Sequence, residues 1–209
     1  MRRSIIAAIT ALAATAAWAL SAGPALAYPP NPPSATTAAG ELASLTVRTE
    51  GSLTGYSRDL FPHWIIQSGT CDTREVVLKR DGSGVTVDSS CHPTAGKWYS
   101  VYDSTWVTDS SGVDIDHIVP LAEAWRSGAN TWTTARRQQF ANDLTIAQLI
   151  AVSASSNRSK GDSDPSAWKP PNTSVRCIYA REWIWVKYTY GLSLQSAEKT
   201  ALQQMLAAC

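Results

Sequence analysis

Histidine is scarce in this chain of 209 residues, which has only three, namely His63, His92 and His117. No H-E-x-x-H run is present, so the chain lacks the two-histidine helix that binds zinc in many peptidases. No G-x-S-x-G run is present either, which argues against the nucleophile elbow of serine hydrolases. A Ser/His/Asp site built from distant residues stays open, but no pattern favours it.

Cysteine is also sparse, and no two cysteines have the C-x-x-C spacing that structural zinc sites prefer. The four are Cys71, Cys91, Cys177 and Cys209. Four cysteines suit disulfides in an oxidising compartment, and they permit three pairings. We favour Cys71–Cys91 and Cys177–Cys209, because each of these bridges closes a local segment within one half of the chain.

Long apolar runs are absent outside the N-terminus. Two arginines precede an apolar run over residues 4–20, and residues 25–27 form a small-x-small cleavage site. This pattern predicts a signal peptide over residues 1–27 and a secreted, extracellular protein that begins at Tyr28. The alternative is a membrane anchor, but the run is short for a span of about 20 residues.

The chain has almost no excess charge, with 18 basic and 17 acidic residues. Arg2 and Arg3 lie in the predicted signal peptide, which leaves 16 basic residues in the rest of the chain. A polyanion would therefore have to be bound by a local basic patch and not by the surface as a whole.

Composition divides the remaining chain into two parts. Residues 28–40 are rich in Pro, Ala and Thr without apolar periodicity, so we expect a disordered linker. Residues 41–209 are long enough for one domain with a core. Eight of the nine Trp lie in this part. They suit a packed core better than an exposed platform for stacked bases.

Apolar periodicity predicts a mixture of short strands and helices. We expect a hairpin over residues 75–87 that turns at Asp81-Gly82, and a second strand pair over residues 97–107. The other expected elements are strands at 114–119 and 149–152, helices at 121–125, 134–142 and 181–190, and a last helix that begins near Ser193. Because no βαβ order is visible, the expected fold class is α+β, in a single compact domain.

The run from Val113 to Pro120 places charged groups inside an apolar strand. Asp114 and Asp116 share one face of such a strand, and His117 points to the other face unless the strand bends. Carboxylates between Ile and Val need a partner such as a metal, a basic group or water. This run alone is equally compatible with a structural histidine.

A second polar run, Ser155 to Asp162, combines an amide, two cations and a glycine. By itself it is typical of a solvated loop. Together the two runs resemble HNH nucleases, in which D-H-I-V-P lies on the first strand of the motif and N-R-x-K-x-D opens its helix.

The resemblance extends over essentially all of the chain after the expected linker. It is to the secreted actinobacterial HNH endonucleases, which are related to the C-terminal domain of the GmrSD restriction enzymes. The resemblance implies a ββα-metal (HNH) motif inside the α+β domain. The runs that carry it are Cys71 to Arg74, Asp114 to Trp125, Phe140 to Asp143, Asn157 to Asp162 and the closing Cys209.

The resemblance also implies roles for individual residues. Asp116 would be a metal ligand, His117 the general base, and Asn157 the second protein ligand of the metal. The middle position of the H-N-H pattern departs from the family, because the expected spacing leads to Gln148. Asn142 could fill that position through a longer insertion, and we favour Gln148.

The expected chemistry needs a base and a cation. A neutral His117 can accept a proton from water near pH 7. A single Asp and a single Asn form a thin ligand set, which suits Mg²⁺ because Mg²⁺ keeps several waters. Mn²⁺ should substitute for it, whereas Zn²⁺ prefers nitrogen and sulfur ligands.

Three basic residues are candidates for substrate binding. Arg74 follows Cys71, so a disulfide would fix its backbone, and its guanidinium could grip a phosphate. A surface ion pair with Asp72 or Glu75 is an equally good interpretation. Arg158 and Lys160 could contact the backbone of a nucleic acid.

The leading functional prediction is a metal-dependent endonuclease that hydrolyses DNA, with RNA as a second substrate. No base-reading module is visible, and phosphate contacts carry no sequence information, so we expect little sequence preference. Two alternatives remain open. One is a non-catalytic, disulfide-stapled binding module of the cell surface, and the other is a zinc-dependent cell-wall hydrolase that uses Asp116 and His117.

Overall fold

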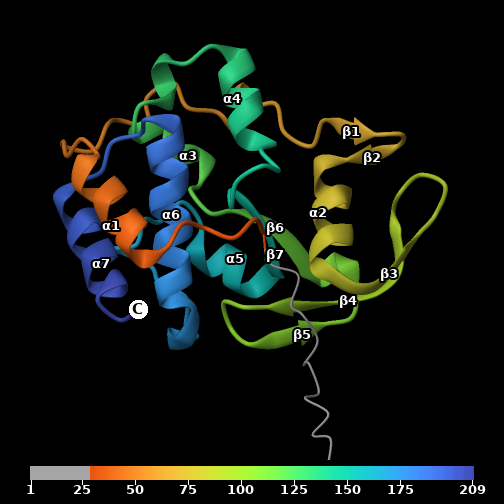
Figure 1. Ribbon diagram of the computed structural model, residues 1–209. Helices are drawn as coiled ribbons and strands as arrows, with labels where there is room; N and C mark the ends of the chain where they lie inside the picture. Colours follow the sequence, from red (N-terminus) through yellow and green to blue (C-terminus); the bar gives the residue numbers. More distant parts are fainter. Residues whose placement is uncertain (1–28) are drawn as a thin grey trace, which may run out of the picture.

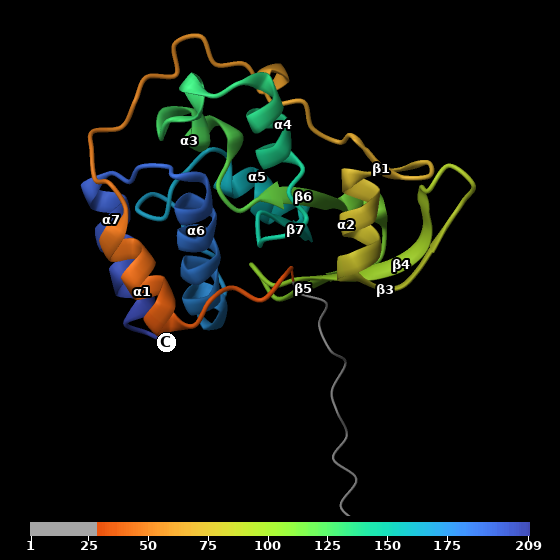
Figure 2. The same cartoon turned by 45° about the horizontal axis from the view of Figure 1, so that its top comes forward.

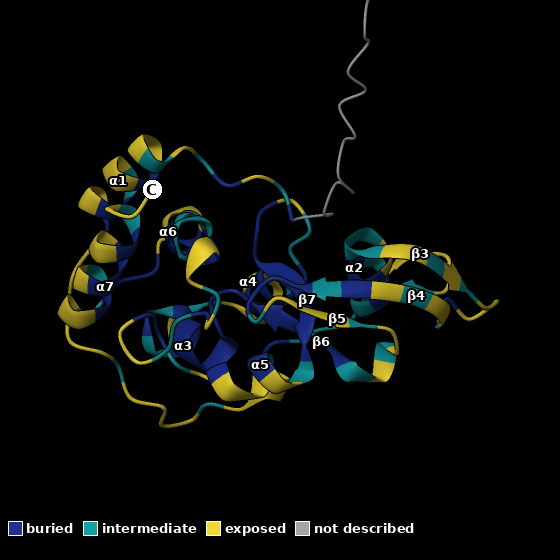
Figure 3. Ribbon diagram, turned by 90° about the horizontal axis from the view of Figure 1, so that it is seen from below, coloured by how far each residue is buried: buried dark blue, intermediate teal, exposed yellow. Residues whose placement is uncertain are grey.

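Two antiparallel strands lie at the centre of the molecule, β6 (Val113–His117) and β7 (Leu149–Ser153). The computed structural model describes residues 29–209, so the predicted signal peptide lies outside the described residues. Figure 3 shows this strand pair buried between the two sides of the molecule. Helix α5 (Ala154–Lys160) follows β7 directly and packs against both strands.

Helices form the larger side of the molecule, to the left of β6 and β7 in Figures 1 and 2. They enclose the main core, in which Trp183, Phe140 and Tyr179 are almost fully buried. These helices are α1 (Ala35–Ser44), α3 (Leu121–Arg126), α4 (Thr134–Ala141), α6 (Arg176–Tyr190) and α7 (Ser196–Leu206).

The other side carries one helix and two small sheets around a second core that contains Val77, Leu78 and Trp98. The helix is α2 (Thr73–Asp81), and a short hairpin of β1 (Ile66–Ser68) and β2 (Cys71–Asp72) precedes it. The larger sheet has the order β3-β4-β5, formed by β3 (Gly82–Val87), β4 (Pro93–Ser100) and β5 (Thr105–Val107). Single 3-10 turns complete the elements at η1 (Arg58–Leu60), η2 (Ser110–Gly112), η3 (Ala129–Thr131) and η4 (Thr173–Val175).

The structure confirms the α+β fold class in a single domain. It also contains both favoured disulfides, Cys71–Cys91 and Cys177–Cys209. Gly191, at φ 67°, ends α6 in the left-handed conformation that glycine adopts without strain. The last helix begins at Ser196 with Gln195 as its N-cap, close to the expected start near Ser193.

The hairpin predicted over residues 75–87 is wrong in its first half, because residues 73–81 form helix α2. A capping box starts this helix. The side chain of Asp72 accepts from the Glu75 backbone N–H at 2.8 Å, and the Glu75 carboxylate accepts from the Asp72 N–H at 2.8 Å. Such reciprocal bonds satisfy two amides of the first turn. β3 therefore pairs with β4.

The disordered linker predicted over residues 28–40 is also corrected, because α1 begins at Ala35. Ser34 caps the helix, and Ala38 and Leu42 are buried where α1 packs against α6 and α7. Arg181 donates hydrogen bonds to the carbonyls of Pro32 and Pro33. A boundary at residue 40 therefore falls inside a helix, whose four-residue apolar spacing is hidden by the Pro/Ala/Thr composition.

Candidate active site

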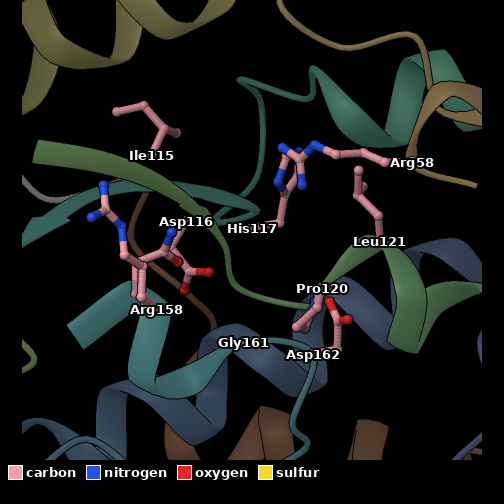
Figure 4. A pocket seen from close by; sticks show the side chains of 10 residues that line it. Arg58, Ile115, Asp116, His117, Pro120, Leu121, Arg158, Gly161 and Asp162 are labelled. Atoms are coloured by element: carbon pink, nitrogen blue, oxygen red, sulfur yellow. The ribbon is translucent and has the colours of Figure 1, made fainter. Parts of the chain in front are cut away.

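A pocket of about 180 Å³ lies where the end of β6 meets α5 and η1. Four residues that the sequence singled out line it together, namely Asp116, His117, Asn157 and Arg158. Figure 4 labels three of them, Asp116, His117 and Arg158. Asp162, from the turn after α5, lines it as well. The two polar runs of the sequence therefore meet at one place in the fold.

Asp114 and Asp116 share one face of β6, as predicted, and both contact side chains of α5. The Asn157 Nδ2 donates to Asp114 Oδ2 at 3.1 Å, and the Arg158 Nε lies 3.4 Å from the same oxygen. Two residues along the strand, Asp116 meets Lys160 of the same helix. α5 therefore binds β6 through these side chains, of which Asp116, Asn157 and Arg158 also line the pocket.

The carboxylate of Asp116 is held by two buried donors. The Lys160 ammonium donates to Oδ1 at 2.8 Å, to Oδ2 at 2.6 Å and to the His117 carbonyl at 2.8 Å. The Tyr102 hydroxyl donates to Oδ2 at 2.6 Å. Burial raises the pKa of Asp116 and lowers that of Lys160, whereas their mutual contact shifts both pKa values the opposite way, toward the charged pair.

Lys160 therefore differs from its expected role as a contact for nucleic acid. Its side chain is fully buried, and three hydrogen bonds direct its ammonium inward. An ammonium with three donor protons so engaged has none left for a phosphate. Arg158, in contrast, exposes 73% of its side chain beside the pocket and stays available for such a contact.

One nitrogen of the His117 ring is tied to the main chain. Nε2 lies 2.9 Å from the carbonyl oxygen of Ala141. Because a carbonyl can only accept, Nε2 carries the proton, and Nδ1 is left with a lone pair. Burial lowers the pKa of His117 to about 3, and the neighbouring Arg58 and His63 also lower it. The ring is therefore neutral at pH 7, with its tautomer set by the Ala141 carbonyl.

Asn142 anchors the turn that presents this carbonyl. Its Nδ2 donates to the carbonyls of Pro62 at 2.8 Å and Gln138 at 2.7 Å. Its Oδ1 accepts from Thr73 Oγ1 at 2.7 Å and from the Ile65 N–H at 3.2 Å. All four hydrogen-bonding positions of the amide are thus filled. They join the end of α4 to α2 and to the chain before β1.

Gln148, the other candidate for the middle of the H-N-H pattern, lies at a different place. Its side chain bonds the backbone of Val119 twice, accepting at 3.2 Å and donating at 3.0 Å. Its own carbonyl accepts from the Ile118 N–H at 2.8 Å. Gln148 thereby fixes the chain just after His117, whereas Asn142 is adjacent to the residue that the imidazole contacts.

The oxygen atoms of the pocket suit a hard divalent cation. Asp116 Oδ1 accepts one hydrogen bond, so one of its lone pairs stays free. Asn157 Oδ1 accepts none from the described residues, while its Nδ2 is engaged with Asp114. Between residues 29 and 209, no three His, Cys, Asp or Glu side chains converge as a metal site. Two oxygen donors fit an ion that keeps several waters, as Mg²⁺ does.

The pocket is lined by Arg58 and not by Arg74, the arginine that the sequence suggested as a phosphate ligand. Arg74 donates to the carbonyls of Ser110 and Val113, both at 3.1 Å, and so fixes the start of β6 away from the pocket. Arg58, which sequence reasoning missed, lines the pocket and reaches toward His117 (Figure 4). Its Nε donates to His63 Nε2 at 3.2 Å, and its two amino groups have no hydrogen bond to the described residues. No motif surrounds Arg58 in the sequence, so only the fold reveals it.

Most residues that line the pocket lie in a part of the chain that matches a known protein family. The family model of the GmrSD restriction endonucleases, C-terminal domain, matches residues 77–205. The chain belongs to this family. The predicted relation to GmrSD is thereby confirmed. In this GmrSD C-terminal domain protein, Asp116, His117 and Asn157 lie inside the matched region, and Arg58 lies before it.

The domain also has a similar full-length relative. An "Uncharacterized secreted protein" from Arthroderma benhamiae (strain ATCC MYA-4681 / CBS 112371) is 56% identical over 201 residues, which cover 96% of this chain and 98% of that protein. This relative confirms the prediction of secretion. No solved structure matches the chain. In the described part of the chain, every helix is too short or too polar to cross a membrane.

Proposed function

We propose that this protein is a secreted, metal-dependent endonuclease of the HNH type that hydrolyses phosphodiester bonds of DNA, with RNA as a second substrate. Membership of a restriction endonuclease family supports the general activity. The observation that carries the mechanism is the Ala141 carbonyl on His117 Nε2, which leaves the lone pair of Nδ1 free in a pocket that Asp116 and Asn157 also line.

The arrangement of elements supports the HNH type. β6 carries Asp116 and His117, β7 pairs with it antiparallel, and α5 follows with Asn157 one turn into the helix. Two strands and a helix in this order are the elements that a ββα-metal motif requires, which supports the proposed type.

In the proposed reaction His117 acts as the general base. Its Nδ1 accepts a proton from the attacking water, while the Ala141 carbonyl holds the opposite nitrogen. A phosphate bound between Arg58 and Arg158 adds negative charge beside the ring. That charge raises the pKa of the imidazole from about 3 toward the range of an effective base.

Asp116 and Asn157 would hold one Mg²⁺ or Mn²⁺ through their side-chain oxygens. When bound, such an ion neutralises charge on the phosphate and on the leaving 3′ oxygen. Lys160 and Tyr102 fix the orientation of the Asp116 carboxylate, so this ligand is preorganised. Arg58 and Arg158 supply guanidinium donors for the non-bridging phosphate oxygens.

We assign the middle position of the H-N-H pattern to Asn142 and keep Gln148 as the rival. Asn142→Ala should lower kcat about 100-fold, because the Ala141 carbonyl loses its support and the base is misplaced. Gln148→Ala should reduce stability and leave kcat within about threefold, measured where both variants are folded. The reverse ranking of the two kcat values would return the position to Gln148.

The deciding experiment is the incubation of supercoiled plasmid and, in parallel, single-stranded RNA with purified protein and Mg²⁺ or Mn²⁺. We expect cleavage that EDTA and His117→Ala both abolish. His92→Ala is the matched control, because His92 exposes 70% of its side chain and does not line the pocket. Cleavage that survives EDTA or His117→Ala would exclude the mechanism. Binding of DNA without cleavage in any metal would favour the binding module.

A further inference from the structure

We propose that Trp64 is a positioning residue for His117, whose indole covers one face of the imidazole and holds the ring so that Nδ1 opens on the pocket. This inference rests on the proposed function. Trp64 belongs to neither polar run of the sequence. It lies in the segment 58–65, which precedes the region matched by the family model.

The contact between the two rings is a stack. The centroids of Trp64 and His117 lie 5.6 Å apart, with 26° between the ring planes. His63 meets the indole edge-on, at 5.3 Å and 75°. The indole also packs against the smaller core. Trp64 thus contacts His63 and the smaller core, and it presents its face to the imidazole.

The stack supplies a constraint that the hydrogen bond lacks. The bond from Nε2 to the Ala141 carbonyl fixes one atom of the imidazole, but it lets the ring turn about the N–H···O direction. A flat indole against the ring face opposes that rotation, because turning would separate the rings or make them collide. The two contacts together fix both the tautomer and the plane of the base.

The backbone at Trp64 indicates that its placement is enforced. Trp64 has φ 58°, which is unusual for a bulky side chain and costs on the order of 1–3 kcal/mol. The chain is anchored two residues before Trp64 and directly after it, since the Pro62 carbonyl and the Ile65 N–H both bond Asn142. Asn142 therefore supports the imidazole along two routes, through the Ala141 carbonyl and through the chain that carries Trp64.

The first test is spectroscopic and needs no catalysis. Imidazole ¹H–¹³C signals of the full-length mature protein would be recorded at one fixed pH, with the His117 signal assigned from His117→Gln. We expect an upfield ring-current shift of the His117 protons in the native protein. Trp64→Leu should remove the shift, and Trp64→Tyr should keep most of it. Trp106→Leu is the matched control, since Trp106 is 44% exposed on β5.

The second test is kinetic, on the native protein and the three tryptophan variants. Trp64→Leu should lower kcat about tenfold or more with KM within about threefold, and Trp64→Tyr should restore most of the loss. An unchanged His117 signal in Trp64→Leu would overturn the inference, as would an unchanged kcat in the folded variant. If Trp64→Leu does not fold, a native kcat in a Trp64→Tyr protein whose ring-current shift is lost would overturn it too.

The two proposals fail in different ways. A native protein that cleaves no nucleic acid would remove the proposed function, while the His117 signals would still decide whether Trp64 orients the ring.

Discussion

At the scale of single residues, the site depends on charges that are removed from water. Lys160 and Asp116 form an ion pair with side-chain exposures of 0% and 5%. A surface counterpart lies on the same strand and helix, where Arg158 meets Asp114 with side-chain exposures of 73% and 25%. Breaking a buried pair leaves an uncompensated charge, whereas breaking an exposed pair leaves two solvated groups.

The two pairs give a matched prediction. Lys160→Met should lower the free energy of unfolding by about 3–5 kcal/mol, because Asp116 would stay buried without its cation. Arg158→Met should change it by no more than about 0.5 kcal/mol. Urea unfolding at pH 7 measures both. Similar losses in the two variants would contradict the burial argument.

Glu182 gives a prediction for pH. Burial raises its pKa to about 8, and its Oε1 has no hydrogen-bond partner in the described residues. The folded protein keeps this acid neutral, while the unfolded chain ionises it near pH 4.5. The contribution of Glu182 to stability therefore falls as pH rises from about 4.5 to 8, by up to about 1.4 kcal/mol per unit.

Glu182→Gln cannot ionise, so it should gain stability relative to the native protein as pH rises. Urea unfolding at pH 5 and pH 7.5 should show a larger gain at pH 7.5. His117 affects stability in the opposite direction, because its lowered pKa costs stability as pH falls below about 6.5. That contribution is common to both proteins and cancels in the difference. A gain that does not change with pH would refute the assignment.

At the scale of elements, the sequence predicted the strands and helices whose apolar residues have a clear periodicity. It missed those whose pattern fits a strand as well as a helix. β6 was predictable because two charges alternate with apolar residues. α2 was not, because the run at residues 76–78 fits a buried strand as well as a helix turn. The capping pair Asp72 and Glu75 could have decided this. Arg58 and Trp64 could not have been found, since only tertiary packing brings a segment without a motif to His117.

Helix α1 gives a prediction at this scale, because it was expected to be linker. Leu42→Ala should cost about 2–4 kcal/mol, since Leu42 is 2% exposed where α1 meets α6 and α7. Leu53→Ala removes the same atoms from a side chain that is 43% exposed, so it should cost less than about 1 kcal/mol. Thermal or urea unfolding measures the two. Equal costs would mean that α1 contributes no packing.

At the scale of the whole molecule, two cores meet at β6 and β7, and each side carries one disulfide. The bridges span 20 and 32 residues, so their entropic contributions should differ by only about 0.4 kcal/mol. Their places differ more. The first bridge fixes Cys71, two residues before Thr73, whose side chain bonds Asn142. The second bridge joins the start of α6 to Cys209.

We therefore expect the two bridges to be separable. Replacing either pair by serine should cost about 2–4 kcal/mol of stability. At a temperature where both variants stay folded, only the Cys71/Cys91 variant should lose kcat, because the support of the Ala141 turn begins at Thr73. Plasmid cleavage beside circular dichroism measures this. An equal loss of kcat in both variants would show that the bridges act through stability alone.

The hydrogen bond on His117 comes from a main-chain carbonyl, and a carbonyl is the same at every position of every protein. No substitution can remove the carbonyl group itself, because it belongs to the main chain, and an alignment of residue types does not show it. The tautomer of the base therefore depends on the path of the main chain at Ala141 and not on the type of the residue there. A change in the tautomer or pKa of His117 would require the end of α4 to move. The Asn142 amide fixes that end, so Asn142 is the residue to substitute for this purpose.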